Sequence, residues 1–412
     1  MASPAVSVVV VSWNRPDWLK QCLRAIGQLD YTRFEVVVVA CSDGAQIAQE
    51  MKVERVLTAD RANISAARNK GVDAAAGDII AFIDDDAVPE PTWLWHLSSA
   101  FENSSVAQAG GTTLGRNGIT VQHAAARVSA AGQTYPVDGA ELKGVIIDPD
   151  GDRHPRLHGT NMAIRREVIV SHGGFDERLA FYLDETDLSY RITKSGGRTA
   201  YVPQAVVHHA SGPSRYRDEE RTPRRVFEIA ASAAIFHRKH CEIAHRYAAR
   251  AAFLKDRRSW IINHMVRGAL TPDRAYRLIQ ELTDGYEDGA GRSGVPEPTF
   301  SQRSTFSSRD IQSPNNDIYL ISSRTGRETT PEKARALVGQ GHRVTVFDYR
   351  PTPRYHRVEF TSDGYWLHTG GIFGREHRDE PLIQKSTLEQ RVRKTLERLD
   401  RIRAKEGSLI GQ

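Results

Sequence analysis

The chain has 412 residues, of which 40% are hydrophobic and 26% are charged, and its formal net charge is +5. This length predicts two domains, because a single core seldom grows beyond about 250–300 residues. The modest positive charge suits an anionic ligand or an acidic membrane surface, and it gives no reason to expect nucleic acid.

Cysteine usage and hydropathy narrow the class of protein further. The three cysteines are far apart and form no CxxC pair, which argues against a disulfide scaffold or a zinc ribbon and fits a reducing compartment. No apolar run reaches the length of a membrane-spanning helix, and the first residues lack the basic segment and apolar core of a secretory signal. We therefore expect a cytoplasmic protein.

The first part of the chain alternates between strand and helix patterns. Buried strands are predicted by β-branched runs at residues 6–11, 34–40, 53–57 and 79–83. Amphipathic helices are predicted after the first strand and at residues 64–76. Asn14 is placed to cap the first helix, and Pro16 suits its first turn. This alternation predicts an α/β fold with a mostly parallel, doubly wound sheet.

Three consecutive carboxylates, Asp84, Asp85 and Asp86, follow the fourth of these strands. A buried strand cannot hold three unpaired charges, because each one is costly to remove from water. They therefore lie at its C-terminal end, where open α/β sheets bind ligands. Two interpretations fit: oxygen ligands for a hard divalent cation, or an acidic turn closed by Pro89.

The later segments predict further elements and domain boundaries. Residues 112–156 read as loops and short strands, residues 158–166 as a short strand leading into a helix, and residues 199–208 as strand pieces that end at His208 and His209. We expect four parts: an α/β domain at 1–222, a helical extension at 223–283, a mobile linker at 284–316, and a small Rossmann-like α/β module with a basic C-terminal helix at 317–412.

Polar groups from several segments converge in this arrangement. The first two strands run into Asn14–Pro16 and Asp43–Gly44, and a later helix begins at Asp184 and Glu185 with acids in its first turn. The carboxyl ends of parallel strands share one edge, so these groups can line one crevice. Each segment alone also reads as an ordinary cap, turn or exposed helix end.

The order of these segments resembles the family 2 glycosyltransferases, which have the GT-A (nucleotide-diphospho-sugar transferase) fold. The resemblance covers about residues 5–240. The matching motifs are VVVVSWNRP at residues 8–16, NISAARNKG at 63–71, FIDDDAVP at 82–89, GTNMAIRR at 159–166, GGFDE at 173–177 and DETDL at 184–188.

The resemblance implies a role for each candidate donor-binding residue. Asn14 and Arg15 would contact the nucleotide, Asp43 would meet its base, and Arg68 would lie near the diphosphate or ribose.

The resemblance also implies a Mn²⁺ or Mg²⁺ cofactor. Asp84 would contact the ribose or the metal, and Asp86 would contact the metal. Because the middle residue Asp85 is also acidic, the pattern leaves open which of the three carboxylates bind the metal. We favour the outer pair. His208 and His209 both match a histidine that helps bind metal or diphosphate in many members.

The catalytic base is implied by the same family pattern. Many members carry Glu-Asp at the start of the later helix, whereas this chain has the reverse order, Asp184-Glu185. By position Glu185 is our candidate, with Asp184 as the alternative. A sugar hydroxyl is too weak an acid to ionise beforehand, so a carboxylate must take its proton as the bond forms. One direct displacement would invert the anomeric centre.

Two other segments allow a site or a further module. His237, Cys241 and His245 share a helical face that could hold zinc, but a polar, partly exposed face explains them better. Residues 317–322 and 339–346 resemble the opening βαβ unit of family 4 GT-B glycosyltransferases. The region is too short for a complete GT-B enzyme, so we expect an accessory or interaction module.

The resemblance implies a metal-dependent inverting glycosyltransferase. Its partners would be a nucleotide-sugar donor, UDP- or a related NDP-sugar, and a glycan or lipid-linked acceptor of surface polysaccharide assembly. A second hypothesis is a catalytically impaired, sugar-nucleotide-binding scaffold for a partner transferase. The helix at residues 388–402 has one apolar and one strongly basic face, and we expect a solvated amphipathic helix packed on its own domain. The alternative is a peripheral contact of this helix with the inner face of the membrane.

Overall fold

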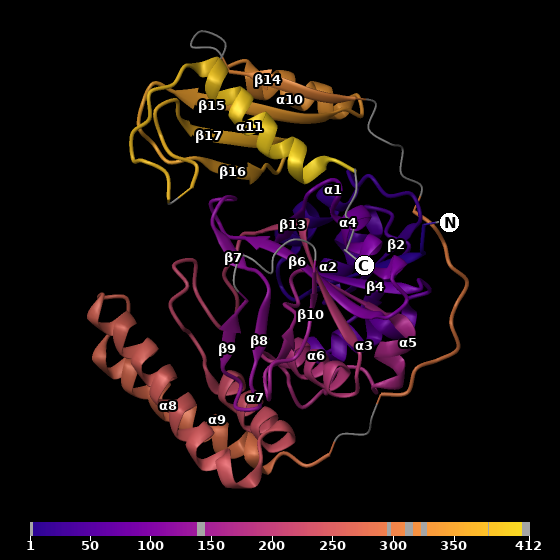
Figure 1. Cartoon of the computed structure of the whole chain (residues 1–412), viewed down its shortest axis with the longest axis vertical. Coiled ribbons are helices and arrows are strands. Elements are labelled where there is room, and N and C mark those ends of the chain that lie inside the picture. The colour runs from indigo at the N-terminus through magenta and orange to yellow at the C-terminus, as the bar shows by residue number, and fades with distance from the viewer. Residues whose placement is uncertain are drawn as a thin grey trace.

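The computed structural model describes residues 3–137, 145–294, 298–309, 316–322, 328–377 and 379–405. A large α/β body holds the central sheet, a helical extension projects from one end of it, and a smaller α/β module lies at the other end (Figure 1).

The central sheet is mostly parallel, as the sequence predicts. Its main path runs in the order β10-β13-β6-β12-β4-β1-β2-β3. Neighbours from β4 to β3 pair in parallel, β12 runs antiparallel between β4 and β6, and β6 pairs in parallel with β13. The strands are β1 (Val6–Ser12), β2 (Phe34–Ala40), β3 (Arg55–Thr58), β4 (Ile79–Asp84), β6 (Val106–Leu114), β10 (Val145–Ile147), β12 (Met162–Arg165) and β13 (Arg198–His209).

Helices cover both faces of this sheet because alternate strand residues point to opposite sides. Val8 and Val36 pack in a core with α1, α2 and α4, whereas Val9 and Phe82 pack in a second core with α3, α5 and α6. These helices are α1 (Pro16–Ile26), α2 (Ser42–Glu50), α3 (Ile64–Ala74), α4 (Trp93–Ser99), α5 (Arg166–Ser171) and α6 (Asp184–Lys194), and a 3₁₀ turn, η1 (Ala100–Glu102), follows α4.

The predicted cap of the first helix is wrong. Pro16 stands in the first turn as expected, but Arg15 occupies the cap position and no side chain there accepts a capping bond. Asn14 instead adopts a left-handed φ of 54°, and its backbone N–H donates to Cys41 Sγ at 3.2 Å. Asn tolerates this conformation better than most residues, so Asn14 turns the chain rather than capping the helix.

Short strands flank the main path of the sheet, and most of them lie in the weakly patterned segment at residues 112–156. The strand β5 (Ala87–Pro89) pairs with the end of β13, and β7 (Val121–His123) pairs with β6. A separate three-stranded sheet has the order β11-β8-β9, formed by β8 (Ala126–Val128), β9 (Thr134–Pro136) and β11 (His154–Arg156).

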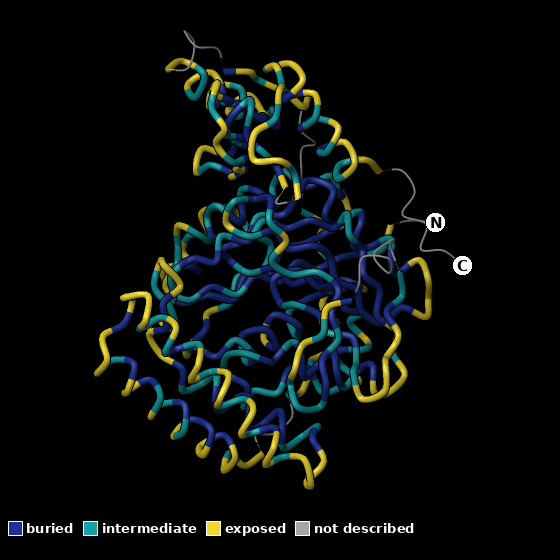
Figure 2. Tube along the Cα trace, turned by 60° about the vertical axis from the view of Figure 1, so that its left-hand side comes forward, coloured by how far each residue is buried: buried dark blue, intermediate teal, exposed yellow. Residues whose placement is uncertain are grey.

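The helical extension consists of α7 (Phe227–His240), α8 (Ile243–Val266) and α9 (Pro272–Gly291). Figure 2 shows buried residues concentrated in the central body and exposed residues along the outer turns of this extension. Ile243 and Tyr247 at the start of α8 are 81% and 82% exposed. None of the helices in the described ranges has the length and apolar character needed to cross a bilayer.

The structure corrects the predicted mobile linker at 284–316. Helix α9 continues through Gly291, and residues 298–309 form an extended segment bonded to the central body. The Ser301 N–H donates to Asp73 Oδ1 at 2.5 Å, and the Arg309 N–H donates to the Phe34 carbonyl at 2.6 Å. These bonds fix the described part of the segment, whereas the predicted division into domains stays a prediction.

The C-terminal module contains the predicted βαβ unit. Strand β14 pairs in parallel with β15, and α10 connects them. Its four-stranded sheet has the order β14-β15-β17-β16. The elements are β14 (Asp317–Ile321), α10 (Thr330–Gly339), β15 (Arg343–Arg350), β16 (Arg357–Phe360), β17 (Trp366–Gly371) and α11 (Leu388–Arg403). Val392 and Leu399 of α11 pack on Phe347 and Tyr349, so the apolar face of this helix covers its own sheet.

The close packing of α9 on α7 generates the first prediction. A Cβ at Gly289 would lie 2.2 Å from the Ala231 carbonyl oxygen and 2.5 Å from its Cα, whereas a Cβ at Gly291 meets nothing within 4 Å. Gly289→Ala should lower the free energy of unfolding by about 1–3 kcal/mol, the usual range for overpacking, in urea denaturation followed by circular dichroism. Gly291→Ala is the control, and equal stability of the two variants would contradict the packing described.

Candidate functional site

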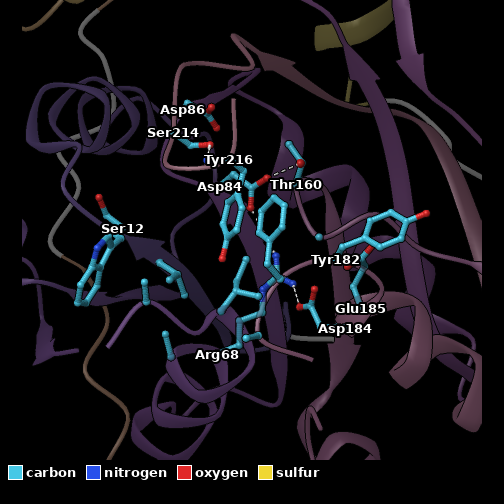
Figure 3. Close-up of a pocket in the computed structure, with 18 of the residues that line it drawn as sticks. Ser12, Arg68, Asp84, Asp86, Thr160, Tyr182, Asp184, Glu185, Ser214 and Tyr216 are labelled. Atoms are coloured by element: carbon cyan, nitrogen blue, oxygen red, sulfur yellow. Dashed lines mark hydrogen bonds and ion pairs between the residues drawn. The ribbon is translucent and has the colours of Figure 1, made fainter. Parts of the chain in front are cut away.

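A cavity of about 410 Å³ opens at the carboxyl edge of the central sheet. Its walls come from the ends of β1, β4 and β13, the start of α3, the turn before α6 and the segment after β13 (Figure 3). The lining side chains used below are Ser12, Arg15, Arg68, Asp84, Asp86, Arg156, Thr160, Asp184, Glu185, His209, Tyr216 and Arg217.

The three carboxylates after β4 point in different directions. Asp85 is fully buried, accepts a hydrogen bond from Ser12 Oγ at 2.7 Å, and forms an ion pair with Arg15. It does not line the cavity. Asp84 is the most exposed of the three, with 27% of its side chain accessible, and it accepts a bond from Thr160 Oγ1 at 2.5 Å.

The outer carboxylates meet a histidine. One ligand atom from each of Asp84, Asp86 and His209 lies within 4.8 Å of the other two, and His209 Nε2 is 3.2 Å from Asp86 Oδ1. Although burial opposes its ionisation, His209 and then Arg15 hold the pKa of Asp86 well below its usual range. Two carboxylates and one imidazole fit a cation such as Mn²⁺, or Mg²⁺ with fewer protein ligands.

The structure corrects one of the two histidine candidates. Successive residues of a strand point to opposite sides, and His209 of β13 faces Asp86. His208 therefore faces away, and its Nε2 lies 2.8 Å from Glu90 Oε1. His208 cannot be a ligand of the same cation in this arrangement.

Arg68 connects the carboxylates of β4 with those of α6. Its guanidinium lies 3.5 Å from Asp84 and makes a closer ion pair with Asp184. The side chain is only 4% exposed, and the rings of Phe82 and Phe175 lie within 5.8 Å of its central carbon. A buried guanidinium that rests on two rings and pairs with two carboxylates has little freedom to reorient, so Arg68 is a fixed positive charge in the cavity wall.

A strained turn positions the acids of α6. Tyr182 and Leu183 both have left-handed backbones, with φ of 78° and 65°, which is costly for residues other than glycine and clusters at functional sites. Asp184 and Glu185 follow directly as the first residues of α6, where the helix dipole favours negative charge.

The two acids of α6 differ in proton affinity. Burial raises the pKa of Asp184 even with Arg68 beside it. Although burial also opposes ionisation of Glu185, Arg156 and then Arg68 lower its pKa; Arg156 Nη2 lies 3.7 Å from Glu185 Oε1. Of the two acids, Glu185 therefore releases its proton more readily than Asp184.

Two predicted donor-binding residues lie away from this cavity. Asn14 lines a neighbouring depression with Trp13 and Trp18. Asp43 is exposed in the first turn of α2 and is not among the residues that line the cavity. Their contacts with a nucleotide stay predictions, as do the roles of the residues that the cavity brings together.

Sequence reasoning missed several lining residues. Tyr216 stacks on Phe181 with ring centroids 3.7 Å apart, and Arg217 lies 3.8 Å from Asp86. Both belong to an arginine-containing segment shortly after His209. Arginines close in sequence to a predicted metal ligand are the pattern from which these residues could have been predicted. Arg156 and Thr160 precede the GTNMAIRR motif or lie in it without any signature of their own.

The possible zinc face of the helical extension has ordinary partners. His237 Nδ1 lies 2.8 Å from the Tyr286 hydroxyl, and His240 Nε2 lies 2.8 Å from Asp187. His245 is 73% exposed at its side chain. Among the described residues, Asp84, Asp86 and His209 form a possible cation site, and no such group of ligand atoms lies in this extension.

A family model and relatives with known names place this chain in the same family. A family model described as "Glycosyltransferase like family 2" matches residues 4–228. The O-antigen biosynthesis protein RfbC of Myxococcus xanthus is 30% identical over 52% of this chain and 18% of its own length. The putative glycosyltransferase EpsH of Bacillus subtilis is 33% identical over 51% of this chain and 61% of its own. The matches thus cover less than two thirds of these relatives.

Solved structures are similar at lower identity. A mannosyltransferase from Pyrobaculum calidifontis, solved with GDP-Man and Mn²⁺, is 17% identical with a TM-score of 0.41, over 71% of this chain and 88% of that one. TarS residues 1–349 from S. aureus, solved with UDP, are 15% identical with a TM-score of 0.42, over 74% of this chain and 99% of that one.

The orientation of Asp85 generates a prediction about stability. Asp85→Asn removes a charged partner from Arg15 and Ser12 in a fully buried position, so the free energy of unfolding should fall by about 1.5–3 kcal/mol. Asp43→Asn is the control, because an exposed carboxylate usually contributes less than about 0.5 kcal/mol. Urea denaturation monitored by tryptophan fluorescence measures both, and similar values would show that Asp85 is not a structural ion-pair partner.

Proposed function

Because the chain belongs to the glycosyltransferase-like family 2, we propose that it transfers a sugar from a nucleotide-sugar donor to a hydroxyl of a glycan or lipid-linked acceptor. One observation carries the proposal: the same cavity is lined by a cation-binding cluster, Asp84, Asp86 and His209, and by an acid pair, Asp184 and Glu185. A transfer of this kind needs both an electrophilic anchor for a diphosphate and a base for a hydroxyl.

The cation-binding cluster supports dependence on Mn²⁺ or Mg²⁺. When bound, the cation would neutralise charge that develops on the departing nucleoside diphosphate. Asp84 and Asp86 supply oxygen donors and His209 one nitrogen donor, while Arg15 pairs with Asp86 Oδ2 at 2.9 Å. Arg68 and Arg217 add fixed positive charge in the same wall, which suits a diphosphate.

The acid pair supports a general base and a single displacement. Glu185 lines the cavity, and its carboxylate can take the proton of the acceptor hydroxyl as the new bond forms. Asp184 is occupied by Arg68 and is less suited to this role. Direct attack by the acceptor on the sugar would invert its anomeric centre without a covalent intermediate.

The lining of the cavity says less about the donor sugar and the acceptor than about the chemistry of transfer. The names of the relatives support surface polysaccharide assembly as the setting, with RfbC named for O-antigen biosynthesis. We propose a UDP- or related NDP-sugar as donor. A cytoplasmic location with contact at the inner membrane face, and the likeness of the C-terminal module to a family 4 GT-B half, stay predictions.

Removal of the proposed base tests the chemistry. Glu185→Gln keeps the shape of the side chain and removes its basicity, so turnover with the matching donor and acceptor should fall about 10²–10⁴-fold, the usual contribution of a general base. The donor Kd should change little, because the charge that would hold the diphosphate is elsewhere. Asp184→Asn is the comparison, and the base assignment is wrong if Glu185→Gln turns over like the wild type.

A thermal-shift screen of nucleoside diphosphate sugars, with and without Mn²⁺, tests the cation cluster. A correct donor at about 100 times its Kd stabilises the folded state by about 2.7 kcal/mol, and we expect this shift only with Mn²⁺. Asp84→Ala should abolish the Mn²⁺-dependent part; Asp84 is preferable to Asp86 because it is partly exposed.

Asp256→Ala, at a 68% exposed aspartate of α8, serves as the matched control for a lost surface carboxylate. An unchanged Mn²⁺-dependent shift in Asp84→Ala would refute the cluster. If wild-type protein binds donor with Mn²⁺ but transfers nothing across a broad panel of acceptors, the scaffold hypothesis replaces the enzyme.

A further inference from the structure

The C-terminal module contacts the strands that carry the cation ligands. Trp366 of β17 packs on His208 with ring centroids 5.0 Å apart. Arg403 of α11 lies over the same Trp366 ring at 5.5 Å, and its Nε donates to Glu90 Oε2 at 2.9 Å. Glu90 in turn lies 2.8 Å from His208 Nε2. These four residues are called the interface cluster below.

The interface cluster lies directly behind the cation ligands. In the pairing of β5 with β13, His209 is opposite Ala87 and His208 is opposite Val88. The Ala210 N–H donates to the Asp86 carbonyl, and the Glu90 N–H donates to the Val206 carbonyl. Asp86 and His209 thus face the cavity, while the adjoining His208 and Glu90 face the module, at the same pairing of β5 with β13.

The interface cluster is buried, and Glu90 is held by both Arg403 and His208. Glu90 and Trp366 are each 1% exposed, and the Arg403 side chain is 10% exposed. Although burial opposes ionisation, Arg403 and His208 lower the pKa of Glu90 to about 2. A buried carboxylate that loses its arginine partner must reorient or admit water, because an unpaired buried charge is costly.

Other contacts hold the module against the end of α1, the turn that follows it and the loop before β7. Arg343 forms an ion pair with Asp30 at 2.9 Å, Gln28 Nε2 donates to the Gly364 carbonyl at 2.7 Å, and the Val358 N–H donates to the Asn117 carbonyl at 2.8 Å. An apolar cluster joins Ala25, Ile119, Val358, Phe360 and Trp366. The ion pair and the two hydrogen bonds are removed from β5 and β13 along the chain, so they offer a comparison that loosens the same interface without touching the interface cluster.

We infer that the C-terminal module positions the cation ligands, so that Trp366 and Arg403 set the divalent-cation affinity of Asp86 and His209 through His208 and Glu90. The inference rests on the cation cluster of the proposed function. Residues that orient metal ligands from behind are as important for affinity as many direct contacts. Trp366, Arg403, Glu90 and His208 are positioning residues and do not touch the reactants.

The test measures Mn²⁺ binding to the full chain by the loss of the free Mn²⁺ signal in electron paramagnetic resonance. Arg403→Met keeps an unbranched apolar stem and removes the charge, and Trp366→Phe keeps an aromatic ring. Each should weaken Mn²⁺ binding by about tenfold, the lower end of the range for residues that orient metal ligands. Arg403→Lys should recover part of the loss, since it restores a positive charge near Glu90.

Two arginine variants are matched controls. Arg401→Met lies on the exposed side of the same helix, where its Nε bonds only to Glu397 of α11, and Arg343→Met breaks the ion pair with Asp30. Both should change Mn²⁺ affinity by less than about twofold, as expected for substitutions remote from the site. Circular dichroism and melting temperature are recorded for every variant, so that loss of folding is separated from loss of affinity.

The outcomes separate this inference from the proposed function. If Arg403→Met binds Mn²⁺ like Arg401→Met, or if Arg343→Met weakens binding as much as Arg403→Met, the positioning role is wrong while the cation cluster stands. His209→Ala tests the cluster itself: if it binds Mn²⁺ like the wild type, the cluster is wrong and the inference falls with it. Should Arg403→Met not fold, Glu90→Gln replaces it under the same criteria.

Discussion

The ion pairs of Arg15 are the interaction on which the rest of the site depends. Three successive carboxylates at the end of a buried strand repel one another, and two of them are almost fully removed from water. Arg15 bonds to both Asp85 and Asp86, and its position follows from the left-handed turn at Asn14 and the proline that starts α1. The guanidinium of Arg15 therefore offsets the repulsion among the carboxylates and leaves one face of Asp86, with Asp84, directed into the cavity.

The central strands could be predicted from the sequence, because short, nearly continuous β-branched runs are typical of parallel strands that are buried on both faces. Strand β6 could not. Gly110 and Gly111 resemble loop residues, yet a Cβ at Gly111 would lie 2.0 Å from the Ala205 carbonyl oxygen. Glycine is required at this position because the neighbouring strand backbone approaches too closely for a side chain. Gly285 and Gly289 misled in the same way: they suggested a linker, whereas they allow α9 to lie against α7.

The candidate site was predictable in its carboxylates and less so in its histidines. Three adjacent acids at a strand end indicate a ligand edge whatever their neighbours are. The choice between His208 and His209 depends on which alternate residues of β13 point toward the cavity, and a register shift between Val202 and Val206 interrupts this alternation. No local sequence pattern shows which side of the sheet each residue faces after the shift. The basic residues after His209 have no strand or helix period, so only the fold reveals that they return to the cavity.

The extended segment at residues 298–309 has a consequence for how the chain is held together. It passes along α3 and β2 and bonds to Asp73, Phe34 and Glu54 before the chain reaches the C-terminal module. The module itself lies against α1 and the strand pair β5–β13. A single backbone cleavage between the helical extension and the module would therefore leave two fragments that remain associated, and gel filtration would report one particle where denaturing electrophoresis reports two.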